Sequence, residues 1–293
     1  MSEENRGQKR HNGSHVHDRG RGSLQHVIGS GAAVLAIAAI GAALSSPTSH
    51  AAPPGQVTVV MVHGAWADTS SWDGELTALE RKGYRARAVA NPLRNLITDA
   101  STVASFLHTI DGPVVLVGHS YGGSVITEAA ASSPNVKALV FVDAYAPEVG
   151  ESASTLNGDG SVILTLPEDQ LFDPVPDPEA PDGSTNLLLK QDVFLNSFAS
   201  DLPRPEAMRL WATQRATSTG ALKTSNTVAA WKSIPSWAFI STGDQIITPA
   251  AKESMAQRAH AQVTTFQGGS HLTLVSHPDA VTAVIESAAA AIA

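Results

Sequence analysis

Short runs of β-branched and aliphatic residues alternate with longer stretches of helical periodicity along most of this chain, from Gln56 onward. The short runs have the length and composition of buried strands, and we find no internal repeat. Such an alternation is typical of a parallel β-sheet with helices on both faces. The expected strands are 57–62, 86–90, 114–117, 138–142, 236–241 and 263–266. The expected helices are 75–82, 100–109, 124–132, 250–259 and 278–290.

The alternation stops between about Pro147 and Pro235, where no run has the pattern of a clear strand. An acidic, proline-rich loop at 173–178 leads instead to helical patches near 187–198 and 204–216. We interpret this interval as a helical cap inserted into the sheet. The predicted organisation is an α/β core in two parts, 53–147 and 236–293, with the cap at 148–235.

Large apolar side chains of the cap are candidates for a substrate pocket, although such residues at helical spacing also pack onto a core. The pattern leaves both roles open. The candidate pocket residues are Phe194, Phe198 and Trp211 from the cap and Trp66 from the core.

The first 52 residues have the pattern of an export signal. Polar and basic residues up to about His26 precede an apolar run at 27–44, and Ser49-His50-Ala51 then supplies the small-x-small pattern of a signal peptidase site. A retained membrane anchor is the less favoured alternative, because the run is rich in Gly and Ala and only weakly apolar. We expect cleavage near Ala52, a secreted or extracytoplasmic protein, and no stable membrane association.

Composition and charge narrow the possible partners. The chain is 43% hydrophobic and 16% charged, which is normal for a globular protein. Residues 53–293 carry 14 Lys and Arg against 24 Asp and Glu, a net charge of −10, so nucleic acid is a poor candidate partner. The chain has no cysteine, which excludes disulfides, a cysteine nucleophile and a cysteine-zinc site. Because we find no other metal or dinucleotide motif, we expect no metal and no cofactor.

A serine between glycines directly follows the expected strand 114–117. The segment Gly118-His119-Ser120-Tyr121-Gly122 has the G-x-S-x-G pattern, and a helical stretch follows it. Between a strand and a helix, the two glycines permit a sharp turn that holds the serine hydroxyl out toward substrate. Ser120 is therefore the candidate nucleophile.

A serine nucleophile needs a base and a group that orients the base. His271 follows the expected strand 263–266 and Asp244 follows 236–241, so both should lie at the same sheet edge as Ser120. Serine, acid, histidine is also the order along the chain that such hydrolases have. Asp143, which follows the strand 138–142, is the alternative acid. We favour Asp244 because a Gly-Asp turn presents it better.

Acyl transfer also needs two N–H groups that stabilise the developing oxyanion. The backbone N–H of Tyr121 lies at the start of the helix after Ser120 and is the first candidate. The loop after the first strand reads Val62-His63-Gly64-Ala65-Trp66, and the Ala65 N–H is the second candidate.

With these residues identified, the chain resembles the α/β-hydrolase superfamily over nearly all of 56–293. His63-Gly64-Ala65-Trp66, Asn91-Pro92-Leu93, Gly118 to Gly123 and Asp143-Ala144-Tyr145-Ala146-Pro147 look like small bacterial serine esterases related to plant methyl-ester esterases and hydroxynitrile lyases. The resemblance implies the fold and a Ser-His-Asp triad. Compared with the full fold of that superfamily, the first strand expected here corresponds to the third strand, so we expect the two-stranded antiparallel edge of the sheet to be missing. The hydroxynitrile lyases carry threonine where this chain has Gly64 and lysine where it has Leu272, so the departures favour an esterase.

The expected function is that of a secreted serine hydrolase that cleaves small-molecule carboxylic esters through an acyl-enzyme intermediate. One alternative is a cofactor-free lyase or perhydrolase with the same triad. Another is a ligand-binding protein that keeps the triad as a relic. The sequence predicts neither the acyl and alcohol specificity nor the oligomeric state.

Overall fold

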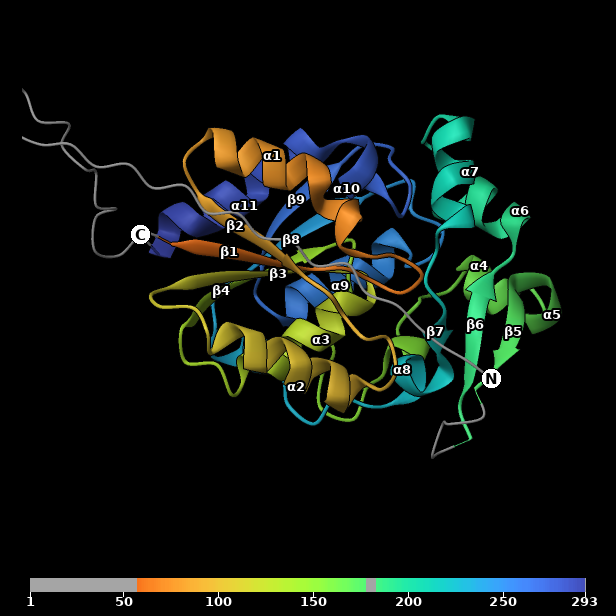
Figure 1. Cartoon of the computed structure of the whole chain (residues 1–293), viewed down its shortest axis with the longest axis horizontal. Coiled ribbons are helices and arrows are strands. Elements are labelled where there is room, and N and C mark those ends of the chain that lie inside the picture. Colours follow the sequence, from red (N-terminus) through yellow and green to blue (C-terminus); the bar gives the residue numbers. More distant parts are fainter. Residues whose placement is uncertain (1–56, 178–182, 293) are drawn as a thin grey trace, which may run out of the picture. The chain divides into compact units, whose positions relative to one another are not determined.

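Six strands form one parallel sheet in the computed structural model, which describes residues 57–177 and 183–292 (Figure 1). Their order is β2-β1-β3-β4-β8-β9, and every neighbouring pair is parallel. The predicted, mostly parallel sheet of about six strands is therefore confirmed. The strands are β1 (Thr58–Val62), β2 (Arg85–Val89), β3 (Val114–His119), β4 (Val136–Val142), β8 (Ser236–Ser241) and β9 (Gln262–Phe266).

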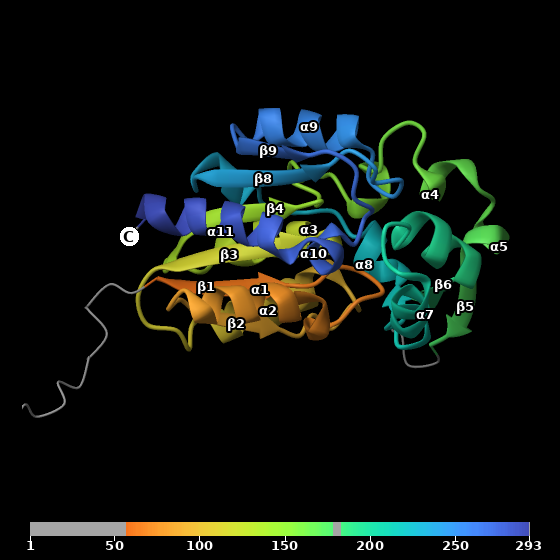
Figure 2. The same cartoon turned by 90° about the horizontal axis from the view of Figure 1, so that it is seen from above.

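Right-handed crossovers place the helices on both faces of the sheet. The connection from β1 to β2 crosses the sheet in the opposite direction to those from β2 to β3, β3 to β4 and β8 to β9. Its helix α1 therefore lies on one face, together with α11, while α2, α3 and α9 cover the other (Figures 1 and 2). The helices of the core are α1 (Asp73–Arg81), α2 (Leu96–Leu107), α3 (Tyr121–Ala130), α9 (Pro249–Arg258), α10 (Thr273–Ser276) and α11 (Pro278–Ile292).

Burial follows from this layering. All residues of β1 and β3 are buried, as the inner strands of a doubly covered sheet must be. Helix α11 buries Val281, Val284, Ile285 and Ala288, which recur at three- and four-residue spacing and form a single apolar stripe. Full burial of one Val or Ile side chain contributes about 1.5–3 kcal/mol, so this face holds α11 on the sheet.

The parallel register brings the carboxyl ends of the strands to one edge. Val62 of β1 pairs with Gly118 of β3, and Gly118 pairs with Phe141 of β4. Ser241, the last residue of β8, pairs with Phe266, the last residue of β9. The loops that follow all of these strands therefore begin side by side.

Most of the segment between β4 and β8 lies beyond this edge of the sheet, at the right of Figures 1 and 2. It contains short helices together with a three-stranded antiparallel sheet of order β5-β6-β7. Its main elements are α4 (Val162–Thr165), α5 (Glu168–Leu171), β5 (Phe172–Pro176), β6 (Thr185–Leu189), α6 (Gln191–Val193), the π-helix η3 (Phe194–Phe198), α7 (Arg204–Ala212), β7 (Thr217–Ser218) and α8 (Thr219–Lys223). Three 3₁₀-helices complete the described chain: η1 (Thr69–Trp72), η2 (Ala153–Thr155) and η4 (Ala230–Lys232).

This antiparallel sheet corrects the expectation that the interval holds no strand. The acidic, proline-rich residues predicted as a loop include β5, an edge strand in which Pro174 and Pro176 are tolerated because an edge strand leaves some N–H positions unpaired. The helical patch predicted from Leu187 begins only after Lys190, because the residues before it form β6. Propensity favoured loop and helix here, and pairing between distant segments prevailed.

The expected export signal lies outside the described residues. Among residues 57–177 and 183–292, none of the helices combines the length and the hydropathy that spanning a bilayer requires.

Candidate active site

The turn after β3 holds Ser120 in a strained backbone conformation, with φ of 52° and ψ of −123°. Such a conformation costs about 1–3 kcal/mol and persists only where the surroundings enforce it. Two glycines leave the necessary space. A Cβ atom on Gly122 would collide with the carbonyl oxygen of Val62, and one on Gly64 would lie 2.7 Å from the Cβ of Ser120. The serine thus stands at the sheet edge, at the start of α3.

His271 and Asp244 meet Ser120 at this edge, although more than 120 residues separate the serine from either along the chain. The hydroxyl Oγ of Ser120 lies 2.8 Å from Nε2 of His271, and Nδ1 of His271 lies 2.9 Å from Oδ2 of Asp244. Since a carboxylate only accepts, Nδ1 carries the proton and Nε2 is free to accept from the serine. This arrangement suits a histidine that acts as a base toward Ser120.

The Asp244 carboxylate is buried and held from both sides. Its Oδ1 accepts hydrogen bonds from the backbone N–H groups of Ile246 at 2.8 Å and Ile247 at 3.2 Å. Burial by itself favours the neutral acid, but the charges and hydrogen bonds of His271 and Lys252 outweigh it and hold the pKa of Asp244 below its ordinary value. Asp244 is therefore ionised and available to stabilise a protonated imidazole.

Two rings and one backbone contact fix the position of His271. The rings of Phe198 and His119 lie 5.0 and 4.8 Å from the His271 ring, measured between centroids. Burial keeps the pKa of His119 well below its ordinary value, so its Nε2–H donates to the carbonyl oxygen of His271 at 2.9 Å. The imidazole is thus packed in place before any substrate arrives.

The two proposed oxyanion donors are the N–H groups of Ala65, in the loop after β1, and of Tyr121, the first residue of α3; both residues line the same cavity as Ser120. Neither donates a hydrogen bond to another residue in the part of the chain that the structure describes. The neighbouring Trp66 N–H is already used, because it donates to Oγ1 of Thr217 in β7 at 3.0 Å. Trp66 itself has a φ of 57°, so the turn aims successive N–H groups in different directions.

The loop that carries Ala65 is anchored by His63. Burial lowers the pKa of His63 to about 4, so the ring is neutral, and its Nε2 accepts from the Asn91 N–H at 2.9 Å. The Asn91 side chain donates in return to the carbonyl oxygen of His63 at 3.3 Å. These contacts hold the loop after β1 against the loop after β2.

The alternative acid, Asp143, has a different environment. Its carboxylate accepts from the N–H and the hydroxyl of Ser241, at 2.7 and 2.6 Å, and from the ammonium of Lys252. The partner of His271 is Asp244 and not Asp143.

Sequence reasoning missed Lys252, whose side chain is only 2% exposed. A signal was present, since Lys252 lies on the same face of its helix as the apolar residues Met255 and Ala256.

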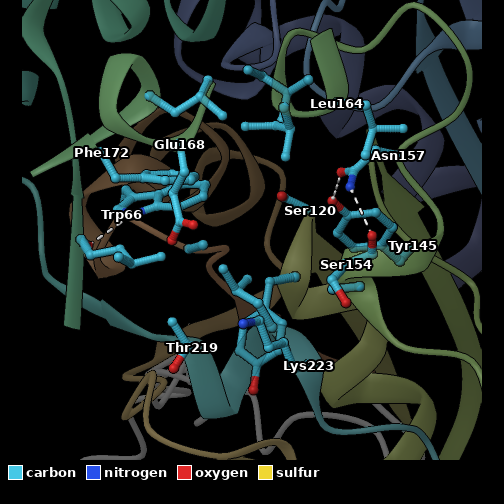
Figure 3. Close-up of a pocket in the computed structure, with 18 of the residues that line it drawn as sticks. Trp66, Ser120, Tyr145, Ser154, Asn157, Leu164, Glu168, Phe172, Thr219 and Lys223 are labelled. Carbon is cyan, nitrogen blue, oxygen red and sulfur yellow. Dashed lines mark hydrogen bonds between the residues drawn. The ribbon is translucent and has the colours of Figure 1, made fainter. Parts of the chain in front are cut away.

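A cavity of about 270 Å³ opens beside Ser120, between the core and the cap (Figure 3). Its wall is mostly apolar, with a polar corner in which the Tyr145 hydroxyl donates to Oδ1 of Asn157 at 2.6 Å. Glu168 and Lys223 line other parts of it. Its apolar lining includes Ala65, Trp66, Ile163, Leu164, Leu166, Leu171, Phe172, Leu187, Leu222 and Ile246.

Only one of the candidate pocket residues lines this cavity. Trp66 forms part of the wall, with its ring stacked on Phe172 and its indole N–H donating to the carbonyl oxygen of Leu187 at 3.0 Å. Phe194 and Phe198, of the cap helix η3, lie outside it and are buried, 4.9 Å apart between ring centroids. Trp211 is also outside and donates from its indole N–H to the carbonyl oxygen of Leu189. These three residues pack the cap, because the unforeseen strands β5 and β6 bring other side chains to Ser120.

Comparison with known proteins agrees with this architecture. A model of the alpha/beta hydrolase family matches residues 59–284. The crystal structure of polyneuridine aldehyde esterase superposes with a TM-score of 0.67 at 19% sequence identity, covering 79% of this chain and 98% of that one.

Two curated relatives match over parts of their length. A carbendazim hydrolyzing esterase of Nocardioides sp. (strain SG-4G) is 33% identical over 110 residues, which are 33% of this chain and 46% of that protein. Pheophorbidase of Raphanus sativus is 28% identical over 161 residues, 50% of this chain and 60% of that protein. The chain thus matches less than two thirds of the length of either relative. The family model, by contrast, matches the chain from β1 into α11. This chain therefore belongs to the alpha/beta hydrolase family.

Proposed function

We propose that this protein is a serine hydrolase that cleaves small carboxylic esters through an acyl-enzyme intermediate. The observation that carries the proposal is the continuous chain of contacts from Ser120 Oγ through His271 to Asp244, at 2.8 and 2.9 Å. The name of the Nocardioides relative, an esterase, supports the same class of reaction.

In the first half of the proposed reaction, His271 Nε2 removes the hydroxyl proton as Ser120 Oγ attacks the ester carbonyl. The negative charge that develops on the carbonyl oxygen accepts hydrogen bonds from the N–H groups of Ala65 and Tyr121. His271 then donates its proton to the departing alcohol, and the acyl group remains on Ser120.

In the second half, water occupies the place of the alcohol. His271 removes a proton from the water as its oxygen attacks the acyl carbonyl, and then returns a proton to Ser120 as the carboxylic acid leaves. Asp244 stabilises the imidazolium in both halves by accepting from Nδ1. Residues of this chain thus supply every proton transfer that the reaction needs.

The cavity indicates the kind of ester. Its mostly apolar wall and its volume of about 270 Å³ favour a compact, uncharged molecule whose ester group reaches Ser120. The Tyr145 and Asn157 corner offers polar groups on one side (Figure 3). We therefore expect short acyl esters with a small apolar or aromatic alcohol to be the better substrates.

Replacement of the nucleophile tests this proposal. We expect Ser120→Ala to lower kcat for short acyl esters by about three orders of magnitude or more, because the covalent route is lost. The melting temperature should not fall, since the strained turn loses only a hydroxyl. The comparison uses a panel of esters that differ in acyl length and leaving group.

The control is labelling of both forms with a fluorophosphonate. Full turnover by folded Ser120→Ala would refute the proposed nucleophile. Labelling of wild type without turnover of any ester would instead favour a lyase or perhydrolase, which cyanohydrin cleavage and peracid formation would distinguish. Tight ligand binding by a wild type that is not labelled would favour the ligand-binding protein.

We further propose that residues 1–52 direct export and are removed. The apolar run 27–44 followed by Ser49-His50-Ala51 supports this. Expression of the full chain in a bacterial host and intact mass measurement of the protein from the culture medium test the cleavage near Ala52.

A further inference from the structure

A lysine buried beside two carboxylates lies directly behind the proposed triad. The ammonium of Lys252 in α9 donates to Oδ2 of Asp244 at 2.7 Å, to Oδ1 of Asp143, and to the carbonyl oxygen of Ser241 at 3.2 Å. The Lys252 side chain is 2% exposed and both carboxylates are fully buried. Burial of such charges costs several kcal/mol each unless they are paired, so the three groups depend on one another.

The Asp244 oxygen that faces Lys252 is also the one that faces His271. Oδ2 accepts from Nδ1 of His271 and from Nζ of Lys252, whereas Oδ1 accepts only from backbone N–H groups. A positive charge at 2.7 Å from this oxygen weakens the attraction of Asp244 for a proton on the imidazole. Asp143 offsets that effect, because its own negative charge lies against the same ammonium.

Asp244, Lys252, Asp143 and His271 form one buried cluster of groups that can carry charge. With both carboxylates ionised and the lysine protonated, this cluster has a net charge of −1 while His271 is neutral. Its net charge becomes zero when His271 takes up a proton. Without Asp143, the cluster would be neutral beforehand and would become positive in a buried site, which is unfavourable.

We propose that Asp143 and Lys252 are a pair of positioning residues, an inference that rests on the proposed function. The pair fixes how strongly Asp244 retains a proton on His271. Neither touches Ser120 or the substrate cavity, and both act through Asp244. Lys252 holds Oδ2 in place, and Asp143 cancels the charge that Lys252 brings.

The other groups around His271 are uncharged, so they do not share this role with Asp143 and Lys252. His119 of β3 is buried and neutral, and its Nε2–H is used by the His271 carbonyl oxygen. Tyr145, after β4, is neutral because burial, and then Asp244, raises the pKa of its hydroxyl. Ser120 is uncharged, and Phe198 of the cap is apolar. Among these described groups, the charged one in contact with His271 is thus Asp244, which Lys252 connects to Asp143.

The test removes charge while keeping shape. Asp143→Asn can retain the contacts, because its Oδ1 can accept from Ser241 N–H and Lys252, and its amide can donate to the Ser241 hydroxyl. We expect the titration midpoint of the His271 ring to move to lower pH by about one unit. The double variant Asp143→Asn with Lys252→Met restores the single negative charge of Asp244, so we expect its midpoint to return toward that of wild type.

The measurement is an NMR titration of the histidine Cε1–H signals, with His271 assigned by its absence from His271→Gln. It requires no turnover, so it separates this proposal from the proposed function, which fluorophosphonate labelling of wild type tests independently. An unchanged midpoint in Asp143→Asn, or the same lowered midpoint in single and double variants, would overturn the role of the pair. Thermal unfolding of each variant confirms that the titration reports folded protein.

Discussion

Single residues at the edge of the sheet account for the chemistry that we propose. Ser120, His271 and Asp244 each follow a different strand, and the strands supply their positions through a common register. Ser120 bears the strain of the turn, His271 is packed between rings, and Asp244 is held by backbone N–H groups. These three could be predicted from the sequence because a motif or a glycine-rich turn marks each of them.

Another residue, Glu75 in α1, affects stability rather than the proposed chemistry. It is fully buried, and neither of its carboxyl oxygens hydrogen-bonds another described residue. Burial, with a contribution from Asp279, raises the pKa of Glu75 well above its ordinary value. The folded protein therefore holds a proton on Glu75 more tightly than the unfolded chain does, and this contribution to stability is lost as pH rises.

We predict that Glu75→Gln removes this pH dependence. Below about pH 4 the carboxyl is protonated in both states, so variant and wild type should differ little. Between the unfolded and the folded pKa of Glu75, the free energy of unfolding of wild type should fall relative to that of the variant by up to about 1.4 kcal/mol per pH unit.

Denaturant unfolding of both proteins between pH 4 and pH 9 checks this. Glu80→Gln is the matched control, because Glu80 lies on the same helix but is exposed. A constant difference between Glu75→Gln and wild type across this range would contradict a buried, protonated carboxyl.

The sequence predicts the strands of the core better than the strands of the cap. The inner strands β1 and β3 are nearly continuous apolar runs, so the sequence predicts their positions to within a few residues: it predicts a strand at 114–117 where β3 spans Val114–His119. The cap strands are short, and β5 contains two prolines, so their local pattern indicates a loop. Only pairing with β6, which follows later in the chain, makes β5 a strand.

The same difference explains why the sequence predicts only some of the residues that line the cavity. Phe172 and Leu187 reach the cavity because they lie in β5 and β6, which form part of its wall, and a pattern that misses those strands misses both residues. Lys252 was missed for another reason. A lysine in an amphipathic helix ordinarily faces solvent, and its burial depends on two carboxylates from distant strands.

At the level of elements, the π-helix η3 is the part of the cap whose Phe198 ring contacts His271. The Phe198 ring lies 5.0 Å from the His271 ring and 6.0 Å from Trp66, between centroids. We predict that Phe198→Ala lowers the free energy of unfolding by about 3–5 kcal/mol and also lowers kcat, because the imidazole loses one of its packing partners.

Phe194→Ala is the matched control for this prediction. Phe194 is as buried as Phe198 and touches its ring, but its ring has no contact with His271 among the described ring pairs. We therefore expect Phe194→Ala to lose about as much stability as Phe198→Ala but less kcat. Measurements of unfolding and of ester turnover in both variants check this. An equal loss of kcat in the two variants would mean that Phe198 acts only through the stability of the cap.

Across the whole described molecule, fold and site follow from one topology. Right-handed crossovers align the carboxyl ends of the strands, and the cap inserted between β4 and β8 closes over that edge (Figure 2). The order Ser120, Asp244, His271 along the chain follows from the order of β3, β8 and β9. Substrate preference, by contrast, depends on the cap, whose path the sequence pattern did not predict.

The central claim is that Ser120 carries the acyl group. Its most direct measurement is rapid acid quenching during turnover of a slow-deacylating ester, followed by mass spectrometry of the peptide that contains Ser120. We predict an acyl adduct on Ser120 in wild type and in no peptide of Ser120→Ala. Ester turnover by wild type with no adduct at Ser120 under single-turnover conditions would contradict the acyl-enzyme mechanism.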